Sequence, residues 1–174
     1  MDDHIITARL QLIPLPLHQL ELALQDINAL EQSLNITIAR SFVTAIVERA
    51  IGMKIDNMRR ADVSQHHWLT YWLIVIQDEN IGVGMLGFKG FPDGTGSTEI
   101  GYGIDPAYQG KGYMSEAVQA LIDWAFQHRF CAQITASEVE NPASRRLLEK
   151  LGAQLVSASD HSTSWKIRRA KPIW

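Results

Sequence analysis

The sequence predicts an α/β domain built on a mixed sheet, and two observations support this class. Apolar runs of strand length alternate along the chain with longer segments whose apolar residues recur at helical spacing. A strand pattern at residues 98–104 leads through a glycine-rich turn into a helical pattern at 112–127, and another strand pattern follows at 132–139. Two strands joined through a helix in this way should be parallel neighbours with a right-handed crossover.

The first half of the chain contains helix and strand signals separated by polar segments. The elements expected there are a strand at 6–13, a helix at 17–25, a helix at 38–50 that ends near Gly52, a loop or frayed helix at 53–66, a strand at 68–77 and its partner strand at 81–89. Residues 68–77 are apolar on both faces, which is typical of a buried strand.

The second half begins with turn-forming residues. The elements expected there are a hairpin loop at 91–97, the strand at 98–104, the helix at 112–127, the strand at 132–139, a helix that starts after Asn141, and a final hairpin of residues 154–159 and 164–169. Asn141 can cap its helix, with Pro142 at the first helical position.

The turn at Gln109-Gly110-Lys111-Gly112 indicates an anion site. The first N–H groups of the following helix lack partners within the helix, and the helix dipole adds partial positive charge there. Glycines let an anion approach this backbone without an intervening Cβ atom. The chemistry predicted is phosphate binding at a helix N-terminus.

Two common phosphate motifs do not fit. A P-loop would require a glycine where Asp105 stands and Ser or Thr where Gly112 follows Lys111. The string GxGxxG occurs at residues 82–87, but the segment that follows, 88–94, cannot open a helix. Those glycines indicate instead a strand against which something packs closely.

Residues 105–117 strongly resemble the acetyl-CoA loop of the GNAT superfamily of N-acetyltransferases. The family pattern Q/R-x-x-G-x-G/A is matched by Gln109 and Gly112, with Met114 as a departure in the last place. Residues 141–152 look like the family's NxxSxxxxxKxG helix beside the pantetheine arm of the cofactor. Residues 7–15 look like the first strand of the ribosomal-protein N-terminal acetyltransferase branch.

The resemblance implies a mostly antiparallel central sheet with helices on both faces and a splayed parallel strand pair that holds the cofactor. Gly101 and Gly103 would allow a bulge or distortion there. The residues expected to bind acetyl-CoA are Gly103, Ile104, Gln109, Gly110, Lys111, Gly112, Tyr113, Met114, Asn141 and Ser144.

Two residues are candidates for catalysis. Glu99 stands where many family members carry a general base, although it would also suit a solvated strand position. Many relatives place a tyrosine where this chain has Leu148, so Ser144 is the candidate donor to the leaving thiolate, or an ordinary residue of the first helical turn.

Composition narrows the remaining classes of function. With 174 residues, 46% of them hydrophobic, residues 1–174 are expected to form a single domain. The net charge of −3 argues against a nucleic-acid partner. The chain has one cysteine, no apolar run long enough for a membrane and no signal-peptide pattern, so we expect a cytoplasmic protein. No metal site is expected, because His66-His67 lacks a third ligand at suitable spacing.

The acceptor and the oligomeric state stay open at this point. The function expected is transfer of an acetyl group from acetyl-CoA to a primary amine, either a peptide N-terminus or a small amine such as a polyamine or aminosugar. A catalytically silent CoA-binding module is the alternative. The acceptor would be gripped by the segments 26–36, 53–66 and 90–97, and the protein would be a monomer or homodimer.

Overall fold

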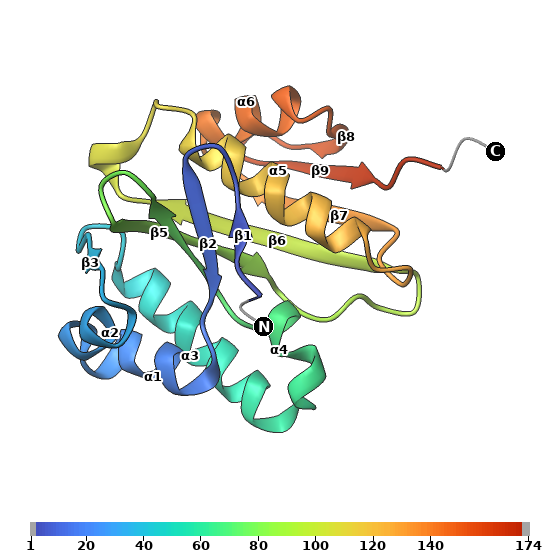
Figure 1. The fold of residues 1–174 in the computed structure, drawn as a ribbon. Coiled ribbons are helices and arrows are strands. Elements are labelled where there is room, and N and C mark those ends of the chain that lie inside the picture. Colours follow the sequence, from blue (N-terminus) through green and yellow to red (C-terminus); the bar gives the residue numbers. More distant parts are fainter. Residues whose placement is uncertain (1–2, 172–174) are drawn as a thin grey trace.

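A mixed sheet runs through the computed structural model, which describes residues 3–171 (Figure 1). In this part of the chain the strand order is β1-β2-β4-β5-β6-β7-β9-β8, and β3 lies beside β5. The pairs β3–β5 and β6–β7 are parallel, and the other neighbours are antiparallel. The prediction of a mostly antiparallel mixed sheet with one helix-linked parallel pair is confirmed.

The elements follow one another with short connections. The strands are β1 (Ile5–Ile6), β2 (Leu10–Pro14), β3 (Thr37–Ile38), β4 (Trp72–Ile76), β5 (Ile81–Phe88), β6 (Ser97–Ile104), β7 (Gln133–Val139), β8 (Gln154–Ala158) and β9 (Thr163–Arg168). The α-helices are α1 (Leu17–Gln25), α2 (Ile27–Leu34), α3 (Ala45–Arg60), α4 (His66–Leu69), α5 (Tyr113–Phe126) and α6 (Pro142–Lys150).

Helices cover both faces of the sheet. Buried residues of α1, α2 and α3 form one core with Leu73 and Val75 of β4. Buried residues of α5 and α6 form the other core with Trp72, Ile74 and Ile76 of the same strand. Because successive side chains of a strand point to opposite faces, a strand between two helical layers must be apolar throughout. The unbroken apolar run of β4 therefore follows from its central place.

The predictions for residues 26–66 were wrong in their boundaries. Residues 27–34 form α2, capped by Asp26, whose carboxylate accepts from the Ala29 N–H at 3.0 Å. The expected helix at 38–50 is α3, which begins only after Thr44 and continues to Arg60. Gly52 lies inside α3 and does not end it, because it does not adopt the positive φ of a glycine that terminates a helix.

Two strand boundaries also differ from the prediction. The expected strand at 6–13 is a hairpin of β1 and β2, closed by a hydrogen bond from the Thr7 N–H to the Leu10 carbonyl at 2.9 Å. Trp68 belongs to α4 and not to β4. Its indole packs among aromatic rings, with ring centroids 4.7 Å from Trp124 and 5.1 Å from Phe88.

A lysine is buried on the α3 side of the sheet. Lys54 is 8% exposed, and its ammonium donates to the carbonyls of Phe88, at 2.5 Å, and Leu69, at 3.3 Å. The nitrogen also lies 4.4 Å from the centre of the Tyr71 ring. Burial, together with repulsion from Lys89, lowers the pKa of Lys54 to about 7.

This shift makes stability depend on pH. Between pH ~7 and the ordinary lysine value of about 10.4, the unfolded chain binds a proton at Lys54 that the folded chain does not, so stability should rise with pH. We expect urea unfolding across this range to show that the unfolding free energy of the wild-type protein rises with pH relative to that of Lys54→Met, by up to about 1.4 kcal/mol per pH unit. Parallel pH curves for the two proteins would show that Lys54 is charged in the folded state throughout.

Candidate active site

The parallel strands β6 and β7 pair only over their first residues. Ser97, Thr98 and Glu99 stand opposite Gln133, Ile134 and Thr135, and the pairing goes no further. The expectation that these strands splay toward their C-terminal ends is confirmed. The gap between them lies where α5 begins after β6 and where α6 begins after β7 (Figure 1).

Backbone groups of β6 face this gap. The ladder to β5 is regular from the Lys89 N–H, which donates to the Glu99 carbonyl at 2.8 Å, to the Asp105 N–H, which donates to Val83 at 2.7 Å. Because an antiparallel ladder alternates, the amides of Tyr102 and Ile104 point away from β5 and toward the gap. The β5–β6 ladder has no bulge at Gly101 or Gly103. The space opens because β6 stops pairing with β7 after Glu99.

The glycine pattern of β5 also has its predicted cause. A Cβ atom added to Gly84 would lie 2.3 Å from the Gly103 carbonyl oxygen, and one added to Gly87 would lie 2.6 Å from the Thr70 carbonyl oxygen. Only glycine lets these strands approach so closely. The GxGxxG string is therefore a packing feature of a strand and not a nucleotide motif.

The turn before α5 presents a row of free backbone donors. Gly110 and Gly112 adopt positive φ, at +75° and +81°, as the tight turn requires. Within residues 3–171, the N–H groups from Gly110 to Ser115 make no hydrogen bonds, and Gly112 caps α5 without a side-chain contact. A helix N-terminus with so many open donors is suited to bind an anion.

A cavity of about 450 Å³ joins the turn, the strand gap and α6. A volume of this size is within the usual range for small-molecule sites. Of the predicted cofactor-binding residues, those that line it are Gly103, Ile104, Gln109, Gly110, Gly112, Tyr113, Met114, Asn141 and Ser144. Lys111 does not line it, and its ammonium lies 5.4 Å from the centre of the Tyr108 ring.

The α6 wall supplies a second helix N-terminus. The Asn141 carboxamide oxygen accepts from the Ala143 N–H at 2.8 Å, which confirms the predicted cap, and Pro142 occupies the first turn. Ser144 follows in that turn and lines the cavity.

The predicted site residues omitted two cations and a tyrosine at this cavity. Arg146 and Lys150 line its α6 side, four residues apart on one helix. Lys150 is the lysine of the NxxSxxxxxKxG pattern, so the sequence did carry a signal for it. Tyr102 lines it from β6. The Tyr102 hydroxyl is buried and has no hydrogen-bond partner in the described chain. Burial raises its pKa, and the neighbouring Ser144 hydroxyl offsets only part of that rise.

Glu99 lies apart from the cavity walls. Its carboxylate accepts from the Lys89 ammonium at 2.6 Å and from the Ser137 N–H at 3.3 Å. Alternation along β6 places its side chain on the sheet face opposite to Tyr102. If it acts, Glu99 would therefore meet an acceptor arriving from the side of the sheet that carries α3.

Neither a membrane helix nor a metal cluster occurs between residues 3 and 171. No helix there is long and apolar enough to cross a membrane. No group of three or more His, Cys, Asp or Glu side chains there could hold a metal ion.

Comparison with known proteins agrees with this geometry. A family model for the acetyltransferase (GNAT) domain matches residues 17–154. The chain belongs to the GNAT acetyltransferase family. The uncharacterized N-acetyltransferase YjdG of Bacillus subtilis is 41% identical over 95 residues, which are 54% of this chain and 56% of that protein. The match thus spans little more than half the length of this curated relative.

Solved GNAT structures share the fold over nearly the whole chain. RimL, a ribosomal L7/L12 α-N-protein acetyltransferase solved with coenzyme A, superposes with a TM-score of 0.66 at 19% identity and covers 95% of this chain and 98% of its own. A GNAT acetyltransferase from Bacillus anthracis gives a TM-score of 0.62 at 22% identity, with 95% and 98% covered. The resemblance to the ribosomal-protein branch therefore holds at the level of the fold.

The turn at Gly112 gives a direct test of the anion site. We expect Gly112→Val to lose CoA binding in calorimetry while the protein stays folded, because valine resists φ near +80° and its side chain would crowd the open N–H groups. The added Cβ would also lie 3.3 Å from the Arg9 guanidinium. Gly94→Val is the matched control, since that glycine has open space around it. If Gly112→Val binds CoA with unchanged affinity, the phosphate does not bind at this turn.

Proposed function

We propose that this GNAT protein is an acetyl-CoA-dependent N-acetyltransferase that acts on a primary amine, and that the α-amine of a peptide N-terminus is its acceptor. We further infer that residues 1–174 act as one domain, since a continuous sheet runs from Ile5 to Arg168.

One observation carries the proposal. Gly110 and residues 112–115, whose N–H groups have no partner in the described chain, line the same cavity as Ile104 of β6 and Ser144 of α6. A pyrophosphate needs the first set of donors, and a thioester needs a donor for its carbonyl and another for its sulfur. The cavity joins all three requirements.

The residues present fit acetyl-CoA. The turn residues Gln109 to Met114 would hold the pyrophosphate, with Lys111 adding charge from outside the cavity wall. Arg146 and Lys150 offer positive charge for the remaining phosphate at the α6 wall. The open strand edge at Gly103 and Ile104 would pair with the amides of the pantetheine arm, as an added strand does, while Asn141 borders the same arm.

Acetyl-CoA, when bound, supplies an activated acetyl thioester. The Ile104 N–H, directed into the gap, would donate to the acetyl carbonyl oxygen as negative charge develops on it. Ser144 would donate to the sulfur as the C–S bond breaks. The Tyr102 hydroxyl lies beside Ser144, so it can donate a hydrogen bond to the Ser144 oxygen and polarise the Ser144 O–H toward the sulfur.

The acceptor assignment rests on proton chemistry. A peptide α-amine has a pKa of about 7.7–8.0 and is partly neutral at pH 7, whereas a lysine side chain at about 10.4 is almost wholly charged. Glu99 is the candidate base: its Oε1 is paired with the Lys89 ammonium, and within the described chain its Oε2 accepts no hydrogen bond. An α-amine needs the least help from such a base, because part of it is already neutral at pH 7.

The test is mass spectrometry of acceptor mixtures incubated with the protein and acetyl-CoA. The mixture contains peptides with free N-termini, the same peptides blocked at the N-terminus but carrying lysine, polyamines and aminosugars. We expect one added acetyl group on the free N-termini. Acetylation of the small amines alone would overturn the acceptor assignment, and CoA binding without thiol release from any amine would overturn the enzyme assignment.

Glu99→Gln tests the base. If Glu99 accepts the proton, kcat should fall by about 10²–10⁴-fold, and activity should recover as pH rises, at lower pH for an α-amine than for lysine. Lys89→Gln is the matched control, because it breaks the same ion pair but keeps the carboxylate. Wild-type kcat in Glu99→Gln from about pH 6 to about pH 9 would exclude Glu99 as the base.

Ser144→Ala and Tyr102→Phe test the sulfur end of the site. Each removes one hydroxyl, so kcat should fall while acetyl-CoA affinity stays near the wild-type value. The double variant should be no slower than Ser144→Ala, because Tyr102 acts through Ser144. Tyr102→Phe should also keep its melting temperature, since the lost hydroxyl has no partner. Additive losses in kcat would show that the two hydroxyls act separately.

A further inference from the structure

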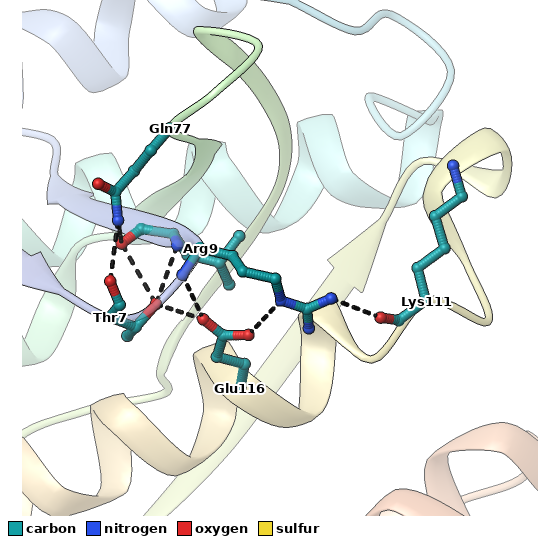
Figure 2. Close-up of polar contacts among 6 residues, drawn as sticks. Thr7, Arg9, Gln77, Lys111 and Glu116 are labelled. Atoms are coloured by element: carbon teal, nitrogen blue, oxygen red, sulfur yellow. Dashed lines mark hydrogen bonds and ion pairs between the residues drawn. The ribbon is translucent and has the colours of Figure 1, made fainter.

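The N-terminal hairpin is tied to the start of α5 through one carboxylate. Glu116, in the first turn of α5, accepts three hydrogen bonds from the turn between β1 and β2 (Figure 2). The Thr7 hydroxyl donates at 2.6 Å and the Arg9 N–H at 2.9 Å, both to Oε1, and Arg9 Nε donates to Oε2 at 2.7 Å. These partners lie more than 100 residues apart in the chain, so the contact is purely tertiary.

Glu116 is held in its charged form. Burial opposes ionisation of this carboxyl group, but the hydrogen bonds from Thr7 and Arg9 outweigh that effect and keep its pKa below the usual range. Its ion pair with Arg9 is partly shielded, with 19% of the Glu116 side chain exposed. Charge-assisted bonds of this kind fix geometry better than neutral ones.

The other side of the Arg9 guanidinium reaches the glycine turn. Its terminal nitrogen donates to the Lys111 carbonyl at 2.9 Å (Figure 2), and its carbon lies 4.5 Å from the centre of the Tyr113 ring. In a trans peptide, the Lys111 carbonyl and the Gly112 N–H point in opposite directions. Holding this carbonyl on the hairpin side therefore directs the Gly112 N–H to the other side, away from Arg9.

The hairpin turn that carries Arg9 is itself restrained. The Gln77 carboxamide donates to the carbonyls of Thr7, at 2.9 Å, and Leu10, at 2.8 Å, which flank the hairpin turn (Figure 2). Gln77 follows β4 directly, so the turn is anchored to the central sheet. A guanidinium carried by this anchored turn can hold a flexible glycine peptide in one orientation.

We propose that Arg9 is a positioning residue for the cofactor: it fixes the Lys111–Gly112 peptide so that its N–H, and not its carbonyl, faces the pyrophosphate. This inference rests on the proposed function. Without the restraint, glycine neighbours at positive φ would let the peptide rotate and present a negative dipole to an anion. Arg9 precedes residues 17–154, which match the family model, so the restraint comes from outside that segment.

Only arginine suits the geometry. Its planar fork donates to Glu116 and to the Lys111 carbonyl at once, and it also covers an aromatic face. A lysine would keep the positive charge with a single nitrogen. If Arg9 served only as a charge near the phosphates, lysine would replace it; if Arg9 positions the peptide, lysine would not.

The experiment compares acetyl-CoA with acetyl-pantetheine, which carries the same thioester without pyrophosphate or nucleotide. In Arg9→Lys and Arg9→Ala we expect KM for acetyl-CoA to rise by about 10- to 100-fold, because charge-assisted hydrogen bonds are lost, while kcat stays nearly unchanged. With acetyl-pantetheine, kcat/KM should stay within about twofold of wild type, because nothing in that substrate uses the turn. General damage to the fold would lower kcat/KM for both substrates.

Arg59→Ala is the matched control, because it removes an arginine from another surface ion pair, with Glu21 at 2.6 Å. Melting temperatures of all variants check that the hairpin stays folded. The Arg9 inference is overturned if Arg9→Lys keeps the wild-type KM for acetyl-CoA, or if its kcat/KM falls equally for acetyl-CoA and acetyl-pantetheine. If the wild-type protein itself uses both thioesters equally well, the pyrophosphate site of the proposed function fails, and the Arg9 inference falls with it.

Discussion

The site depends on where the pairing of β6 with β7 stops. After Glu99 and Thr135 the two parallel strands separate, and the backbone of β6 at Tyr102 and Ile104 is left open on that side. Helices follow both strands, so the N-termini of α5 and α6 meet at the same gap. A longer ladder would have satisfied those strand amides and closed the space, leaving two helix N-termini without a cavity between them.

Two further constraints keep the separated strand in place. On its other edge β6 stays paired with β5 as far as Asp105, and the contact at Gly84 is closer than any side chain would allow. At the far end of the turn, Arg9 and Glu116 join the N-terminal hairpin to α5. The open edge is thus held by β5 along one side and by the hairpin-anchored start of α5 at its end, which suits a site that must hold its donors in place before a ligand arrives.

Sequence patterns predicted the parts of the fold whose signals are local. The helix α5 and the strands from β5 to β9 were found because strand periodicity, turn residues and helical spacing agree within short windows. The region of α2 and α3 was misjudged, since Gly52 imitates a helix end and Thr44 was not recognised as the cap. Tyr102 and Arg9 gave no local signal: the importance of each arises from partners brought near by tertiary structure.

The turn before α5 and the opposite sheet face are joined by one buried side chain. Asp105, 5% exposed, accepts from the Ala107 N–H at 3.0 Å, within the turn, and from the Ser41 N–H at 3.1 Å, in the segment before α3. A buried carboxylate must keep its donors, because losing one leaves charge unsatisfied in a poorly solvated place. The segment around Ser41 therefore cannot shift independently of the turn that would hold the pyrophosphate. Since the Glu99 side chain lies on that same α3 side, Asp105 links the side of the sheet proposed for the acceptor to the turn proposed for the pyrophosphate.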